Sequence, residues 1–423
     1  MKFILIVYFF KISVKGVKPL RLSEVEDILI CYNKDNKLSK FGFFPAIAWF
    51  NDRVLNLEKR FEELTVKSKR NHADPVKRRT KTFTEAKMCI GIITLVLLQV
   101  ERFSNIHDKF SDETELAEMI GLKRFFSDQT AYNFINNFSK WHTDQLKKIN
   151  KQLLIDFGQS TKQEMPIIDI DMTTFSLESK KREGAIPGYN KIKRGKPCYQ
   201  WSAAFCDGEV IAHVLDEGNT VSRTNFDQVL EESLDCLGKD IALIRLDSGY
   251  ISAEVLNYMT GKNLFTLCGC PYKWVMGQIE NKGIVVEWDE YNDNTWLFDL
   301  GITSVVKNAK DKYRVILVKK EQEEINIKAS EKYLFYAIVT NFFLTQSKEI
   351  IYREYHGRQT IENFFKEVKN PFKSTKIPSG RMRGNHAYLW LVSISYNCYM
   401  IFKKTVCRMT GKSIHLKQFA INS

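Results

Sequence analysis

The N-terminal third of the chain carries the apolar spacing of helices. From Leu22 to about Phe157, apolar residues recur three and four positions apart, a spacing that returns to one face of an α-helix. The clearest stretches are Ala46–Leu64, Thr84–Phe103 and Ser127–Leu154. We therefore expect an all-helical N-terminal domain over residues 1–160.

After Glu164 the pattern changes to short apolar runs of strand length. The run Ile167–Ile170 ends at Asp171, and the run Ile241–Leu246 ends at Asp247. Strand-like segments flank Asp207-Gly208, a dipeptide typical of a two-residue β-hairpin turn. Those segments are Tyr199–Cys206 and Glu209–Leu215, and helical spacing follows in Asn225–Leu237 and Ser248–Met259. Strands alternating with helices predict an α/β domain.

Strand patterns return between about residues 271 and 345. The segments concerned are Gly283–Trp288, Thr295–Leu300, Tyr313–Lys319 and Tyr333–Val339. After Thr345 the helical spacing resumes and continues to the C-terminus. We therefore expect a second domain over residues 161–423, of mixed α/β class, which a β-rich insertion interrupts at about 271–345.

The charge balance indicates a polyanionic partner. The 423 residues include 63 Lys and Arg against 50 Asp and Glu, a net charge of +13, with an isoelectric point near 9.1. This surplus favours nucleic acid or an acidic membrane surface. Because the longest apolar runs, Met1–Phe10 and Met88–Val100, are too short to span a bilayer, we expect a soluble protein. Nine cysteines without paired spacing favour free thiols in a reducing compartment.

Two strand-terminal aspartates are candidate ligands for a hard cation. Asp171 and Asp247 each end an apolar run, and the carboxyl ends of neighbouring strands form the usual active-site edge of an open α/β sheet. Each could instead cap a turn or a helix. Asp169 is an alternative first ligand.

A helix over residues 355–369 supplies a third carboxylate. On one helix, Tyr355, Arg358, Glu362 and Lys369 share one edge beside an apolar stripe. With the two aspartates, Glu362 would complete an oxygen-rich site suited to Mg²⁺. A pair of ions about 3.5–4 Å apart would clamp the attacking and leaving oxygens of a phosphoryl displacement. The alternative is an ordinary surface pair between Arg358 and Glu362.

Four ordered motifs resemble those of insertion-sequence DDE transposases, enzymes of mobile elements. The segment 355–369 matches their Y-x2-R-x3-E-x6-K signature. Asp171-Met172-Thr173 is similar to their D-x-T motif, although Met172 stands where the family often has a small residue. Residues 245–250 resemble the R-x-D-S-G-[FY] motif, and residues 188–199 resemble a basic motif of one branch. The matches run from about residue 116 to residue 396 and so cover most of the chain.

The resemblance implies a fold, an activity and a set of site residues. The fold would be a ribonuclease-H-like mixed sheet flanked by helices, forming a catalytic domain with the β-rich insertion before Glu362. Asp171, Asp247 and Glu362 would hold two Mg²⁺ ions, with Mn²⁺ tolerated, while Tyr355, Arg358 and Lys369 would contact phosphates. The activity would be cut-and-paste DNA transposition, in which metal-dependent cleavage at terminal inverted repeats precedes strand transfer into target DNA. The enzyme would act as a homodimer in a synaptic complex, in the cytoplasm and nucleoid or in a nucleus.

Basic segments outside the signature are candidates for binding DNA. Lys193, Arg194 and Lys196 lie in the loop after the first acidic strand, and a charged arm spans Lys67–Lys81. The N-terminal helices and this arm are the candidates for reading transposon ends. Three tryptophans of the insertion are candidates for stacking on a base, with core packing as the alternative; these are Trp274, Trp288 and Trp296. Two other functions remain open: a plain metal-dependent nuclease of the same fold, and an inactive or domesticated DNA-binding derivative.

Overall fold

The chain forms two compact units, which are described separately. A computed structural model describes residues 8–9, 28–29, 44–64, 83–190, 193–322, 332–342, 346–370, 372 and 376–410. The first unit takes in the described residues of Met1–Gln159, Lys181–Glu183 and Lys366–Ser423, and the second those of Ser160–Lys180 and Gly184–Phe365. The segment Lys366–Ser423, which we expected in the second domain, groups with the N-terminal residues. The arm Lys67–Lys81 lies outside the described residues.

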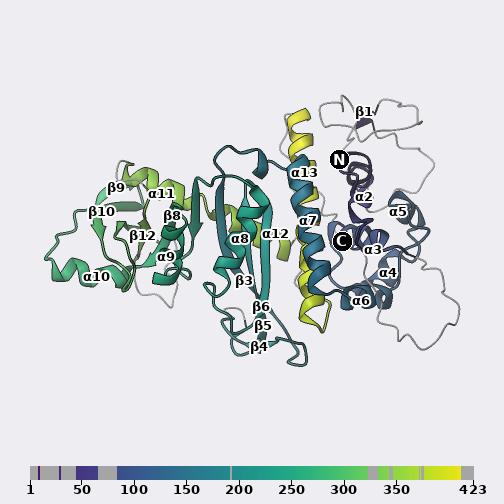
Figure 1. The fold of residues 1–423 in the computed structure, drawn as a ribbon, viewed down its shortest axis with the longest axis horizontal. Helices are drawn as coiled ribbons and strands as arrows, with labels where there is room; N and C mark the ends of the chain where they lie inside the picture. Colours follow the sequence, from purple (N-terminus) through teal and green to yellow (C-terminus); the bar gives the residue numbers. More distant parts are fainter. Residues whose placement is uncertain are drawn as a thin grey trace. The chain divides into compact units, whose positions relative to one another are not determined.

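The first unit is built from helices (Figure 1). They are α1 (Phe44–Trp49), α2 (Leu57–Phe61), α3 (Glu85–Leu97), α4 (Ile106–Phe110), α5 (Thr114–Met119), α6 (Asp128–Asn136), α7 (Lys140–Phe157) and α13 (Met382–Thr410), with short π- and 3₁₀-helical turns at Phe50–Val54 and Phe103–Asn105. Both α3 and α7 pack against α13. Among its described residues, the only strands are β1 (Tyr8–Phe9) and β2 (Ile28–Leu29), which pair antiparallel.

Side-chain caps set where the helices of this unit begin. Thr84 accepts a hydrogen bond from Lys87 N at the start of α3, and Ser127 does the same for α6. The expected single helical stretch from Ser127 to Leu154 is two helices, because Ser139 starts α7 with a capping box that includes His142. Every helix in the described part of the chain is too short or too polar to cross a membrane.

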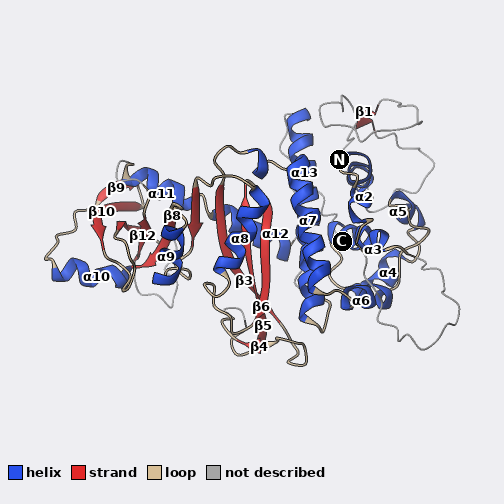
Figure 2. Cartoon of the chain, viewed as in Figure 1, coloured by secondary structure: helices blue, strands red, loops and turns tan. Residues whose placement is uncertain are grey.

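The second unit contains one long mixed sheet (Figure 2, strands in red). Its strands are β3 (Ile167–Ser176), β4 (Ile186–Pro187), β5 (Pro197–Cys206), β6 (Glu209–Glu217), β7 (Leu243–Leu246), β8 (Thr266–Pro271), β9 (Asp289–Asn292), β10 (Thr295–Thr303), β11 (Tyr313–Glu321) and β12 (Tyr333–Thr340). Its helices are α8 (Phe226–Leu237), α9 (Ala253–Gly261), α10 (Tyr272–Asn281), α11 (Lys348–His356) and α12 (Gln359–Lys369), the last continuing into the first unit.

Five strands form the core of this sheet in the order β6-β5-β3-β7-β8. The pairs β6–β5 and β5–β3 are antiparallel, whereas β3–β7 and β7–β8 are parallel. The predicted hairpin turn joins β5 and β6, where Asp207 and Gly208 both have positive φ (48° and 82°), as a type I′ turn requires. Helix α8 packs against β5 and β6. The order and directions are those of a ribonuclease-H-like sheet, so the expected fold class is confirmed.

The insertion extends the same sheet. Strand β12 pairs antiparallel with β8, and β11, β10 and β9 follow outward. The predicted strand at Gly283–Trp288 is wrong, since α10 ends just before it and the ladder to β10 begins only at Asp289. Without a partner strand, the backbone groups of Gly283–Trp288 cannot form the hydrogen bonds of a sheet. The side chain of Val285 in this segment is 77% exposed. Helix α11 packs onto this part of the sheet through Ile351 and Tyr352.

Candidate active site

The two candidate aspartates lie side by side at the end of the β3–β7 ladder. The last parallel pair is Ile170 with Leu246, and Asp171 and Asp247 follow it on their respective chains. Asp171 does not end its strand as predicted, because β3 continues to Ser176 by pairing with β5. The shorter partner β7 ends at Leu246, which leaves the β7 side of β3 open at Asp171.

The predicted single helix over residues 355–369 is wrong. Helix α11 ends at His356 and α12 begins at Gln359, with Gly357 and Arg358 between them. Gly357 N closes α11 by donating to the carbonyls of Arg353 and Glu354 at 3.1 and 3.2 Å. Tyr355 therefore belongs to the last turn of α11, whereas Glu362 lies in the first turn of α12.

Arg358 joins the helix-borne carboxylate to the strand-borne one. Its Nη1 donates to Asp171 Oδ2 at 2.9 Å, and its Nη2 donates to Glu362 Oε1 at 2.7 Å. Burial lowers the pKa of Arg358, but the charges of the surrounding acids, led by Asp171 and including Glu362 and Asp247, raise that pKa on balance. The guanidinium thus interacts with all three candidate carboxylates.

The charge of Asp171 is only partly compensated. Burial, and then repulsion from Asp247, raise the pKa of Asp171 to about 7, against the opposing effects of Arg358 and the Met172 amide. That amide donates to Asp171 Oδ1 at 2.7 Å, while Asp247 Oδ1 accepts from Gly249 N at 2.9 Å. Three acids that face one arginine leave this site short of positive charge.

Tyr355 and Tyr250 complete the surroundings of the carboxylates. A Cβ on Gly269 would stand 2.4 Å from Tyr355 Oη and 3.0 Å from Ser248 N, so only glycine leaves room for this phenol beside the Asp247 loop. Tyr250 is fully buried. Burial first, and then the charges of Asp171 and Asp247, raise the pKa of Tyr250.

The donor set fits a hard divalent cation in its chemistry. The candidate ligands are all carboxylates, which Mg²⁺ prefers, and the repulsion between Asp171 and Asp247 is what a cation would relieve. Among the described residues, no three His, Cys, Asp or Glu side chains lie close enough together to hold one ion. Arg358 occupies the position between Asp171 and Glu362.

A family comparison shows to which family the chain belongs. A family model described as "Transposase DDE domain group 1" matches residues 69–421, most of the chain. The chain belongs to this family. The resemblance drawn from the sequence motifs is thereby confirmed at the level of the family.

Other comparisons give only distant likenesses to this transposase-family chain. Among solved structures, a similar chain is that of "Mos1 transposase paired-end complex with left transposon end", at 14% identity and a TM-score of 0.19. The match covers 49% of this chain and 64% of that one, so less than two thirds of the Mos1 chain is spanned. A comparison with curated proteins finds no match.

The predicted DNA-binding residues of the transposase-family chain lie in several places. Lys193, Arg194 and Lys196 are exposed in the loop before β5, where Lys193 pairs with Glu178. Lys369 ends α12, two turns after Glu362, and belongs to the first unit. Arg182, a basic residue between β3 and β4, donates instead to the carbonyls of Ile377 and Ser379 within the first unit. Arg182 is therefore a structural residue.

The three insertion tryptophans differ in exposure. Trp274 on α10 is 41% exposed. Trp288 packs against Phe335. Trp296 packs against Tyr333, and Lys319 Nζ lies 5.1 Å from its ring centroid. Base stacking by any of them stays a prediction.

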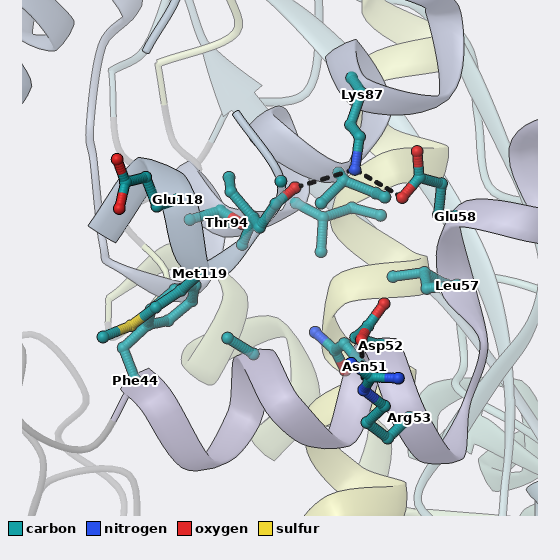
Figure 3. A pocket seen from close by; sticks show the side chains of 15 residues that line it. Phe44, Asn51, Asp52, Arg53, Leu57, Glu58, Lys87, Thr94, Glu118 and Met119 are labelled. Atoms are coloured by element: carbon teal, nitrogen blue, oxygen red, sulfur yellow. Dashed lines mark hydrogen bonds and ion pairs between the residues drawn. The ribbon is translucent and has the colours of Figure 1, made fainter. Parts of the chain in front are cut away.

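The first unit contains a pocket of about 250 Å³, in which charged lining residues form ion pairs with one another (Figure 3). Two of its charged lining residues pair with each other, since Lys87 Nζ lies 2.5 Å from Glu58 Oε2, and Lys87 also donates to Ile120 O at 3.2 Å. Asp52 and Arg53 pair likewise at 2.9 Å. The motifs quoted from the sequence lie at the carboxylate cluster of the second unit and not at this pocket.

The residues that surround the three carboxylates were not predicted from the sequence. Asp169 is not exposed to a ligand, because both its oxygens accept hydrogen bonds from Arg245 and one also accepts from Thr360. Arg245 and Tyr250 stood within the quoted R-x-D-S-G-[FY] motif, which was the available signal for both. Gly269 lies outside every motif, and only the structure shows its contact with Tyr355.

Proposed function

We propose that this chain is a cut-and-paste DNA transposase in which Asp171, Asp247 and Glu362 hold two Mg²⁺ ions, with Mn²⁺ tolerated. The observation that carries the proposal is the convergence on Arg358 of three acids that lie 76 and 115 residues apart (247 − 171 and 362 − 247). A purely structural arginine needs one carboxylate. Three acids beside one arginine are suited to cations and to a phosphate that Arg358 would then bind.

The chain's own residues would divide the work between metal and phosphate. When bound, two divalent ions supply Lewis-acid stabilisation of the attacking and leaving oxygens in an in-line displacement. Arg358 would release Asp171 and Glu362 and donate its two N–H groups to a phosphate oxygen pair. Tyr355, held over Gly269, would donate its hydroxyl to a neighbouring phosphate. Water would be the first nucleophile, and the freed 3′-hydroxyl would be the second.

The proposed substrate is DNA at two stages. Terminal inverted repeats would be bound and cut first, and target DNA would receive the 3′ ends, with two copies of the chain in one synaptic complex. Lys193, Arg194, Lys196 and Lys369 would contribute phosphate contacts, in keeping with the net charge of +13. The enzyme would act where the host keeps its DNA, in the nucleoid or in a nucleus.

The test is a cleavage assay on the element's own ends with Glu362→Gln. The substitution removes a ligand charge but keeps the side-chain size, so Mg²⁺-dependent cleavage should fall at least about 100-fold, the order typical for loss of one catalytic group. Specific binding to the ends should stay close to that of the wild type. Glu280→Gln, an exposed acid on α10, is the matched control and should cleave normally.

A second assay separates transposition from simpler functions. A pre-cleaved end with a free 3′-hydroxyl should be joined to target DNA by the wild type. Cleavage without joining would indicate a plain metal-dependent nuclease, and end binding without either reaction would indicate an inactive derivative. Normal cleavage by Glu362→Gln would remove Glu362 from the mechanism.

A further inference from the structure

A second charged pair, Asp169 with Arg245, lies two residues before Asp171 and Asp247 on the same two strands. The two residues are direct partners across the parallel β3–β7 ladder. Arg245 Nε and Nη2 donate to the two oxygens of Asp169 at 2.6 and 2.8 Å. The side chain of Arg245 is 10% exposed and that of Asp169 is 3% exposed. Since residues two apart in a strand share a face, Asp169 lies on the same face of the sheet as Asp171.

This pair holds the α11–α12 junction on both sides. Before the junction, Arg245 Nη1 donates to Glu354 O at 2.9 Å. After it, Thr360 Oγ1 donates to Asp169 Oδ2 at 2.9 Å. Between these contacts, a Cβ on Gly357 would stand 2.0 Å from Arg245 Nη1, so the guanidinium can reach the junction only because residue 357 is glycine.

We propose that Asp169 and Arg245 are positioning residues, which fix the α11–α12 junction and thereby set Arg358 and Glu362 opposite Asp171. Arg358 lies inside the held segment and Glu362 is two residues beyond Thr360. The inference rests on the proposed function, because it concerns the placement of two groups of that site. It also gives Asp169 a role other than that of a first metal ligand.

Stability alone is a weak reason for such a pair. Removing two charges from water costs about as much as their attraction returns, so a buried ion pair is often no more stabilising than apolar residues of similar volume. Arg245 adds a fixed direction, since its Nε and Nη2 donate to Asp169 on β3 while its Nη1 donates to the carbonyl of Glu354 on α11. A fixed direction is useful where a reacting group must be placed closely.

The same unit contains a matched control pair, Arg314 with Asp299. Arg314 Nη2 and Nε donate to Asp299 Oδ2 at 2.6 and 3.0 Å, and Nη1 donates to Gln346 O at 2.6 Å. Asp299 lies on β10 and Arg314 on β11, and Gln346 precedes α11. This pair therefore also links two strands to a backbone carbonyl, but it does so away from the α11–α12 junction. Arg314→Lys therefore reports what loosening such a pair does away from the junction.

The experiment compares Arg245→Lys with Arg314→Lys in the full-length protein by amide hydrogen exchange and by end cleavage. Arg245→Lys keeps the charge but cannot make the forked contact, so exchange within residues 354–362 should rise about tenfold. Cleavage should fall about 10- to 100-fold, as expected when a reacting group is misplaced by about 1 Å, with end affinity unchanged. Arg314→Lys should change neither the amide exchange within residues 354–362 nor the rate of end cleavage.

Thr360 allows a milder test, should Arg245→Lys fold poorly. Thr360→Val removes one hydroxyl and should lower the cleavage rate about 3- to 10-fold, the order of one hydrogen bond, without changing end affinity. Thr360→Ser keeps the hydroxyl, so this variant should cleave at the wild-type rate. Equal losses in Val and Ser variants would overturn the role of this contact.

The outcomes distinguish this inference from the proposed function. If wild-type protein cuts no DNA, the proposed function fails, and the exchange data still decide whether Arg245 holds residues 354–362. If the wild type cuts DNA but Arg245→Lys leaves exchange and cleavage unchanged, the positioning role is wrong while the proposed function stands. Equal effects of Arg245→Lys and Arg314→Lys would likewise contradict a specific positioning role.

Discussion

Asp171 and Asp247 directly follow Ile170 and Leu246, the last pair of the parallel β3–β7 ladder, and their charges repel. Parallel pairing brings them together without any flexible segment to let them separate. Arg358 compensates one charge of the acidic cluster. The acidic cluster therefore has an excess of negative charge, which has consequences for the stability of the protein as well as for its chemistry.

Asp171→Asn should stabilise the protein while it abolishes cleavage. The pKa of Asp171 is raised to about 7, so its protonated form is favoured by folding. That contribution is complete below the unfolded-state value of about 3.9 and is lost as pH rises through about 7, at most about 4 kcal/mol at 1.36 kcal/mol per pKa unit. Without divalent ions, wild-type stability should therefore fall from pH 4 to pH 8, and the Asn variant should lose most of this slope.

The measurement is thermal or urea unfolding across that pH range with a metal chelator present. Asp240→Asn, at an exposed position, is the control and should keep the wild-type slope. An unchanged slope in Asp171→Asn would show that Asp171 is already ionised in the folded protein at low pH, contrary to its surroundings.

Arg358→Ala should bind metal more tightly and cut DNA more slowly. Arg358 donates to both Asp171 and Glu362, so a metal ion at the proposed site would compete with this guanidinium for their oxygens. Removing the guanidinium should lower the Kd for Mn²⁺ by about tenfold, equivalent to about 1.4 kcal/mol. Cleavage should fall at least about 100-fold, because a bound phosphate would lose its bidentate donor.

Calorimetric titration with Mn²⁺ measures the first effect separately from activity. Arg353→Ala, an exposed neighbour on α11 with 67% of its side chain accessible, should change neither quantity. Weaker Mn²⁺ binding by Arg358→Ala would mean that Arg358 organises the carboxylates for metal rather than competing with it.

Parts of the site could be predicted from sequence because they depend on local pattern. The apolar runs before Asp171 and Asp247 identified both strands, and the hairpin at Asp207-Gly208 fixed the register of β5 and β6. The contact that Arg245 makes at the break could not be predicted, because Arg245 is 112 residues from Gly357 (357 − 245). Periodicity reports which face of a helix is apolar, but not which distant side chain contacts the end of the helix.

The insertion illustrates the same limit in a strand. The segment Gly283–Trp288 has strand-like residues, but the described sheet offers it no ladder partner. Strand propensity describes a residue's fit to a pleated, paired surface, and the pairing is decided by tertiary structure. The continuation of the core sheet through β8 and β12 was likewise beyond any local pattern.

Gly269→Ala should displace Tyr355 and impair cleavage. The added Cβ would stand 2.4 Å from Tyr355 Oη, so the phenol must move, at a cost of about 1–3 kcal/mol for an overpacked site. Adding Tyr355→Phe removes the clashing oxygen, so the double variant should regain most of the stability but not the activity. Urea unfolding and end cleavage of Gly269→Ala and of the double variant measure both effects.

Gly261→Ala is the control for that substitution, since nothing lies within 4 Å of its added Cβ at the end of α9. It should keep full activity and unfold at an equal or slightly higher urea concentration. Full activity of Gly269→Ala would show that Tyr355 can leave its place over Gly269 without consequence for the reaction.

The basic loop before β5 should contribute to DNA affinity but not to the chemical step. Lys193, Arg194 and Lys196 are exposed there, and each phosphate contact adds about 0.9 to the slope of log K against log salt. Replacing all three by alanine should lower that slope by about 2–3 and weaken binding to specific and nonspecific DNA alike. At saturating DNA the cleavage rate should stay near the wild-type value. Lys312→Ala, exposed in the turn before β11, is the control; an equal change of slope in that variant would show that the loop has no special part in DNA binding.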